Sequence, residues 1–204
     1  MENSHDVIKH LLISHQIKKV TLIVHKVGSN WSQRFTNKSM RENMLAAYTD
    51  ARVEIQSHSI SSLEYLSLEL SDFKERFTLK SNEVVSLSSR VKIRRTYLHI
   101  PMMNFHTENG FGEKEICKAI AYIYPNNKGV LLNSGRHQHY YCLDKLLSQS
   151  EWEKFLGNFL IPFNLVHPGY IGYQLYRGFS TLRITSQKEF KPQVPKVIKM
   201  FNFD

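Results

Sequence analysis

Hydrophobic residues recur along the chain at two periods, one typical of helices and one typical of strands. Helical spacing occurs over residues 4–18, 61–77, 113–124, 150–162 and 168–178. Apolar runs or alternation typical of strands occur over residues 20–27, 52–58, 96–105, 129–143, 179–185 and 197–203. Helices and strands alternate, which predicts an α/β or α+β fold.

Several local signals refine this pattern. Ser4 is the predicted cap of the first helix, with His5, His10 and His15 on its solvated side. Residues 39–48 begin with a capping-box pattern and predict a short helix. Residues 61–77 predict one helix with a buried stripe, and Pro168 and Gly178 bracket another helix. The polar residues 81–89 are a candidate boundary between two lobes.

The central stretch of the chain is Gly129–Leu143, which predicts a β-hairpin. An apolar strand enters the turn Asn133–Arg136, and alternation beyond it places His137, His139 and Tyr141 on one face. Ser134, Arg136 and one histidine offer the hydroxyl, guanidinium and imidazole donors that suit a triphosphate. Gly135 would let the backbone approach such a ligand closely. An ordinary hairpin with packed His and Tyr side chains is the alternative.

Charge adds a preference for anionic partners. The chain of 204 residues carries 27 Lys and Arg against 18 Asp and Glu, a net charge of +9. This balance favours a nucleic acid or a nucleotide. Four cations, Arg90, Lys92, Arg94 and Arg95, precede the strand pattern at 96–105. They predict a track for phosphates, although a solvated strand edge explains them equally well.

Composition excludes several other classes of protein. Hydrophobic residues make up 42% of the chain, which is typical of a globular protein. No apolar run approaches the roughly 20 residues of a membrane-spanning helix, and the first residues do not form a signal-peptide pattern. The two cysteines, Cys117 and Cys142, make no metal motif and suit a reduced compartment. A cytoplasmic protein without a membrane partner is therefore expected.

The second half of the chain resembles the archaeo-eukaryotic primase (primase–polymerase) superfamily, and most of all its primase 1D-like group. The segments that carry the resemblance occur in that group's order: Tyr97–Phe105, Ser134–His139, Ile171–Gly172 and Arg177–Phe179 with Leu182–Arg183. The resemblance spans roughly Tyr97 to Pro195. It implies an α+β fold with an RRM-like palm sheet and flanking helices in residues 91–204. Residues 1–90 would then form an N-terminal α/β lobe, either separate or part of one continuous domain.

The resemblance also assigns roles to residues of this chain. Ser134, Arg136, His139 and Arg183 match positions that bind the nucleotide. Asn104 and His167 match positions where the family pattern has Asp, and His106 matches a further acid. Polymerases of this kind hold Mg²⁺ or Mn²⁺ with such carboxylates. These departures predict a metal site that is lost or sharply altered.

Three functions therefore remain open. The first is a primase–polymerase-like domain, a candidate pseudoenzyme, that binds a nucleoside triphosphate, DNA or RNA without two-metal chemistry. The second is an active nucleotidyltransferase, a DNA primase or polymerase of DNA replication, that uses Mg²⁺ or Mn²⁺ bound by other acids. The third is a hydrolase with Zn²⁺ or Mn²⁺ at Asn104, His106 and His167, because imidazole suits transition metals.

Overall fold

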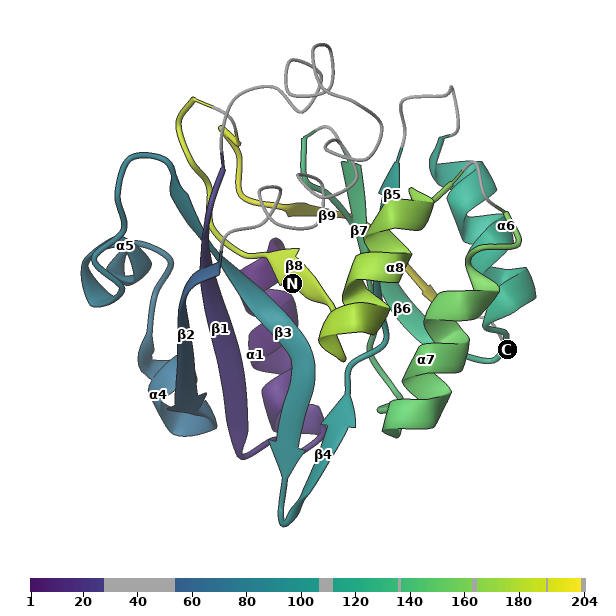
Figure 1. The fold of residues 1–204 in the computed structure, drawn as a ribbon, viewed down its shortest axis with the longest axis horizontal. Helices are drawn as coiled ribbons and strands as arrows, with labels where there is room; N and C mark the ends of the chain where they lie inside the picture. The colour runs from purple at the N-terminus through teal and green to yellow at the C-terminus, as the bar shows by residue number, and fades with distance from the viewer. Residues whose placement is uncertain (28–53, 107–111, 136, 163–164, 190, 203–204) are drawn as a thin grey trace.

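The computed structural model describes residues 1–27, 54–106, 112–135, 137–162, 165–189 and 191–202. These residues form an α+β fold with two antiparallel sheets that lie side by side (Figure 1). The helix predicted over residues 39–48 lies outside them. Among the described helices, none is both long and apolar enough to cross a membrane.

The described elements follow the predicted alternation of helices and strands. The strands are β1 (Lys19–Lys26), β2 (Glu54–Ser61), β3 (Glu83–Ile93), β4 (Thr96–His99), β5 (Met102–His106), β6 (Lys128–Asn133), β7 (His137–Cys142), β8 (Thr181–Arg183) and β9 (Lys196–Asn202). The helices are α1 (Ser4–Ser14), α4 (Ser62–Ser67), α5 (Asp72–Arg76), α6 (Glu113–Ile123), α7 (Gln149–Asn158) and α8 (Pro168–Arg177).

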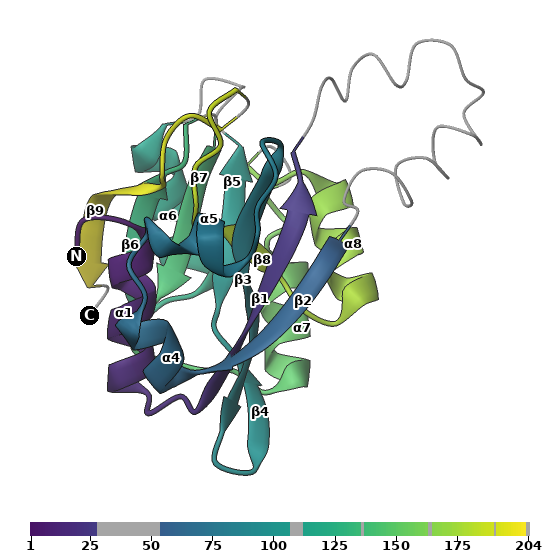
Figure 2. The same cartoon turned by 90° about the vertical axis from the view of Figure 1, so that its left-hand side faces the viewer.

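The first sheet has the strand order β2-β1-β3-β4, and β8 also pairs with β3. β3 is the long central strand, and its residues from Glu83 to Ser89 are all buried. Residues 81–89, read from the sequence as a candidate boundary, thus lie mostly within the centre of a sheet. The strands are strongly twisted, as the view from the side shows (Figure 2).

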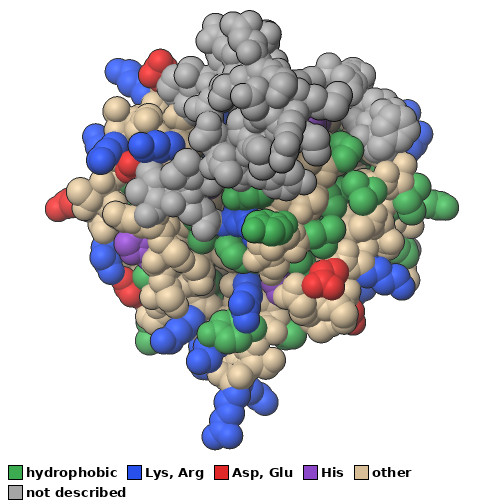
Figure 3. Space-filling view, in the orientation of Figure 1, with side chains coloured by type: hydrophobic (Ala, Val, Ile, Leu, Met, Phe, Trp, Pro, Cys, Tyr) green, Lys and Arg blue, Asp and Glu red, His purple; other side chains and the backbone are tan. Residues whose placement is uncertain are grey.

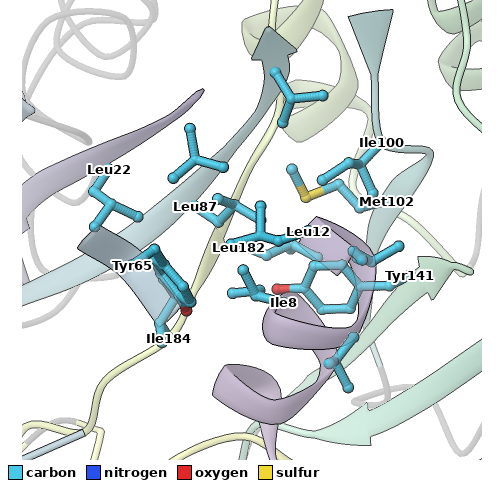
Figure 4. Packing of buried hydrophobic residues seen from close by; sticks show 14 of the residues in the cluster. Ile8, Leu12, Leu22, Tyr65, Leu87, Ile100, Met102, Tyr141, Leu182 and Ile184 are labelled. Carbon is cyan, nitrogen blue, oxygen red and sulfur yellow. The ribbon is translucent and has the colours of Figure 1, made fainter. Parts of the chain in front are cut away.

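The second sheet has the order β5-β7-β6-β9 and separates two hydrophobic clusters. On one face, Met103, Phe105 and Tyr140 pack in a cluster with residues of α6, α7 and α8. On the other face, Met102 and Tyr141 join a second cluster with α1 and the first sheet (Figure 4). This alternation follows the period of a strand and confirms the facial assignment predicted for residues 137–141.

Pro101 marks the point at which the chain passes from one sheet to the other. The sequence predicts one strand over residues 96–105, but the structure divides it into β4 and β5. The Ile100 N–H donates to Ser89 O of the first sheet at 2.9 Å, whereas Met102 pairs with Tyr141 in the second sheet. Proline has no N–H to donate, so a ladder is readily broken there.

Other local predictions are wrong in detail. Residues 61–77 form two short helices, and Leu63 of the predicted buried stripe is 81% exposed. Asn3, rather than Ser4, caps α1, and Ser148 caps α7. His5 is buried instead of solvated, and its imidazole bonds to the Tyr65 hydroxyl and the Leu68 carbonyl. The helix over 168–177 is confirmed, with Gly178 in the left-handed region at a φ of 75°.

The predicted division at residue 90 falls inside β3. The cluster that contains α1 and the first sheet also contains Met102, Val130 and Tyr141 of the second sheet. Apolar residues from both sides of residue 90 therefore share one core. The division into two lobes stays a prediction.

Candidate functional site

Four polar side chains of the candidate site come from paired positions on β5 and β7. Asn104 lies opposite His139, and His106 lies opposite His137. They share the face that bears Met102 and Tyr141, so the polar group continues the core between the sheets toward the ends of these strands. The imidazole rings of His106 and His137 have centroids 4.2 Å apart.

His167 reaches the same place from α8. β5 is an edge strand, and the His106 N–H donates to the Leu165 carbonyl at 2.8 Å. This bond fixes the segment that leads into α8, and the rings of His167 and His106 have centroids 5.8 Å apart. His167 is also the N-cap of α8, because its Nδ1 accepts the Gly169 N–H at 3.0 Å. In the neutral ring the proton is consequently on Nε2.

Ser134 and Arg183 meet at the turn between β6 and β7. The Ser134 hydroxyl and N–H both donate to the His137 carbonyl, at 2.8 and 2.9 Å, and close the hairpin turn. The Arg183 guanidinium donates to the carbonyls of Ser134, Gln193 and Thr185. Its side chain is buried, which lowers its pKa to about 10, so it stays charged at neutral pH.

His139 lies within reach of this charge. Burial is the main cause that holds the pKa of His139 well below its usual value, and the charge of Arg183 is the next. His137 and Lys191 act in the same direction. His139 is therefore neutral, and among the described residues its buried Nδ1 has no hydrogen-bond partner. The same holds for Asn104 Oδ1 on the paired strand.

These observations place most of the predicted site residues. Asn104, His106 and His167 come together, and so do Ser134 and Arg183, with His139 between the two groups. Arg136 lies outside the described residues. Sequence reasoning passed over His137 and Lys191. His137 could have been predicted, because it shares a strand face with His139, whereas nothing in the local pattern marks Lys191.

The predicted nucleic-acid cations lie apart from this group. Arg90 and Lys92 are on β3, and Arg94 and Arg95 form the turn to β4. This hairpin projects beyond the rest of the described chain at the lower edge of both ribbon views (Figures 1 and 2). Lys and Arg side chains gather at the same place on the molecular surface (Figure 3).

The polar pairs on β5 and β7, α8 and Arg183 follow one another along the chain in the order of the primase motifs described above. A family model described as archaeo-eukaryotic primase 1D-like matches residues 63–196, well over half of the chain. The chain belongs to the archaeo-eukaryotic primase 1D-like family. No curated protein and no solved structure matches it. The match begins before Tyr97, so the primase-like region also includes β3 and β4.

The primase relationship raises the question of whether the site fits Mg²⁺. That ion prefers oxygen ligands, and carboxylates above all. At the positions that the resemblance assigns to the metal, this chain has one amide and two imidazoles, and His167 Nδ1 accepts the Gly169 N–H. Among the described residues, no group of three His, Cys, Asp or Glu side chains is placed to hold a metal. These residues do not fit Mg²⁺.

Proposed function

We propose that this chain is a primase–polymerase-like domain, with β5-β7-β6-β9 as its palm sheet, that binds phosphate groups of a nucleotide or nucleic acid without a divalent metal. In this proposal the ligand lies beside His106, His139 and His167, where β5 ends and β7 begins. The family membership supports the class of domain. The side chains at the motif positions support the binding mode.

The observation that carries the proposal is the sign of the charge around His139. Besides burial, the groups that shift the pKa of His139 are Arg183, His137 and Lys191, and none of these is a carboxylate. A phosphate is attracted to such surroundings, whereas a dication would be repelled by Arg183. Imidazole N–H groups and the remaining guanidinium N–H groups are suitable donors to phosphate oxygens.

Two buried polar atoms also support a polar occupant. Asn104 Oδ1 and His139 Nδ1 lack hydrogen-bond partners among the described residues, although buried polar groups are nearly always paired. A water or a ligand hydroxyl could donate to Asn104 Oδ1, and His139 Nδ1 could donate to a phosphate oxygen in the tautomer that carries its proton there. The hydrolase hypothesis lacks a comparable support, because no group of three His, Cys, Asp or Glu side chains among the described residues is placed to hold a metal.

The test combines binding and catalysis. A fluorescent nucleoside triphosphate is titrated into the full chain in EDTA and then in Mg²⁺, and primer extension is assayed with Mg²⁺ and with Mn²⁺. We expect the same affinity in EDTA as in Mg²⁺, no extension with Mg²⁺ and at most traces with Mn²⁺. Binding that requires Mg²⁺, or robust extension by the unmodified chain, would contradict the proposal.

A double variant tests the motif positions themselves. Asn104→Asp with His167→Asp restores two carboxylates, and Asp is also a favourable N-cap residue for α8. Mg²⁺ affinity should rise, because two anionic ligands then face the same site. The matched control is Asn158→Asp with His10→Asp, which makes the same change in charge on α7 and α1. Equal Mg²⁺ binding by the two double variants would show that residues 104 and 167 are not at a latent metal site.

A further inference from the structure

The β3–β4 hairpin carries an aromatic ring among its cations. Lys92 lies directly opposite Tyr97, and Arg90 lies one diagonal step away on the same face. The Arg90 guanidinium is 4.5 Å from the centre of the Tyr97 ring, and Lys92 Nζ is 5.8 Å from it. Even so, Tyr97 is 51% exposed. The hairpin thus presents a partly open aromatic face within a cationic frame.

The cations of this hairpin form no ion pair within the described part of the chain. Among the described residues, none of Arg90, Lys92, Arg94 and Arg95 forms a salt bridge, although Lys9, Arg76 and Lys199 do. Arg90, Arg94 and Arg95 are exposed. Four cations on one short projection repel one another, and an anionic partner would offset that repulsion.

The turn residue gives an independent indication. Arg94 has a φ of 50°, in the left-handed region, at a two-residue hairpin turn. Gly and Asn are the residues that favour such positions, since a side chain there strains the backbone. The chain nevertheless has Arg94 followed by Arg95 at this tip. Gln16, Thr78 and Asn126 also have a positive φ, but Arg94 combines it with an exposed cationic turn, which motivates a functional hypothesis for this position.

We propose that the β3–β4 hairpin binds single-stranded nucleic acid, with Tyr97 stacking against a base and Arg90, Lys92, Arg94 and Arg95 contacting phosphates. An aromatic ring framed by cations is the arrangement with which proteins hold unpaired strands. A duplex keeps its bases stacked inside and offers no base face to Tyr97. The inference rests on the proposed function for its class of ligand, but uses a different surface of the domain.

The first experiment measures binding of a fluorescent oligothymidylate, and of the same strand in duplex form, by anisotropy at several salt concentrations. We expect tighter binding of the single strand. Tyr97→Ala should weaken it about fivefold or more, which is the lower end of the effect of base stacking. Tyr97→Phe should keep the affinity of the unmodified chain. Equal loss in both variants, or a preference for the duplex, would overturn the inference.

Two further variants separate charge from folding. Arg94→Ala with Arg95→Ala should reduce the slope of log affinity against log salt by about 1.4, at about 0.7 for each phosphate contact. Lys74→Ala with Lys80→Ala removes the same charge from exposed positions elsewhere and should leave the slope unchanged. Arg94→Gly should raise the melting temperature while it weakens binding. A fall in both would mean that Arg94 has only a structural role.

The same set of proteins distinguishes this inference from the proposed function. Hairpin variants should bind the fluorescent nucleoside triphosphate as the unmodified chain does, because the hairpin lies apart from the group formed by His106, His139 and His167. If the unmodified chain binds the nucleotide but not the oligonucleotide, the hairpin inference fails and the proposed function stands. If it binds the oligonucleotide through Tyr97 but not the nucleotide, the opposite conclusion holds.

Discussion

Arg183 is the side chain whose replacement should affect the fold most directly. Its guanidinium donates to three backbone carbonyls, with distances of 2.7 Å to Ser134 and 2.8 Å to Gln193, and a third bond to Thr185. These bonds tie β8 in the first sheet to the turn between β6 and β7 in the second. They use three of the five guanidinium N–H donors, so at most two remain for a ligand.

The size of the effect follows from these bonds. A hydrogen bond to a charged group contributes about 1.5–3 kcal/mol, and bonds made by one side chain are not additive. Arg183→Ala would also leave carbonyls without donors in a region where Arg183 itself is 7% exposed. We expect the free energy of unfolding to fall by about 4–5 kcal/mol, an unusually large value for one substitution. For a chain of this length the melting temperature should fall by roughly 10–15 °C.

Thermal unfolding followed by circular dichroism measures this change, and nucleotide titration of the same samples measures affinity below the transition. Arg95→Ala, an exposed cation on the hairpin turn, is the control and should leave the melting temperature unchanged. If Arg183→Ala melts within about 2 °C of the unmodified chain but binds nucleotide at least tenfold more weakly, then the guanidinium serves the ligand and the structural reasoning is refuted.

Three other substitutions or conditions have clear expected outcomes. Burial lowers the pKa of His99 to about 4, so protonation favours the unfolded chain. The contribution of His99 to stability should be constant above about pH 6.5 and fall by roughly 3 kcal/mol toward pH 4, and His99→Gln should remove this component from the pH dependence measured by urea titration. Gly129→Ala should lower stability by about 1–3 kcal/mol, because the added Cβ would lie 2.6 Å from both Tyr140 Cε2 and Phe201 Cε2. In the control Gly157→Ala on α7, the added Cβ meets open space, and the substitution should raise stability. Ser134→Ala should lower stability by about 1 kcal/mol through the lost bond to His137 O, and a tenfold loss of nucleotide affinity without that change would indicate a ligand role instead.

Short-range patterns in the sequence predicted the elements that short-range forces determine. The hairpin of β6 and β7 follows from alternation and a polar turn, and α8 follows from Pro168 and Gly178. Pro101 was visible too, but its consequence, a change of sheet, depends on which strands lie nearby. The burial of His5 likewise depends on Tyr65 and Leu68, which lie far along the chain and cover it.

The candidate site likewise depends on contacts between distant residues that no local sequence pattern predicts. The pairing of Asn104 with His139 needs the register between β5 and β7, which no local pattern contains. His167 is about sixty positions beyond His106 in the sequence. It lies beside His106 in the structure, where the His106 N–H donates to the Leu165 carbonyl. The order of motifs shared with the primase family suggested this grouping, and the helical and strand periods alone would not have done so.

In the proposed function, the charges around His139 determine what kind of ligand the domain can hold. In a two-metal polymerase site, carboxylates make the protein anionic and the metal ions make the occupied site attractive to a triphosphate. Here the positions next to His139 carry imidazoles and an amide, and Arg183 supplies a permanent charge. In the proposed function, the protein itself supplies positive charge where a related polymerase would hold its metals. Under our proposal this exchange keeps an affinity for phosphate, yet it removes the ions that would stabilise charge during transfer to a 3′-hydroxyl. Under the same proposal, binding and catalysis are separable in this fold for that reason.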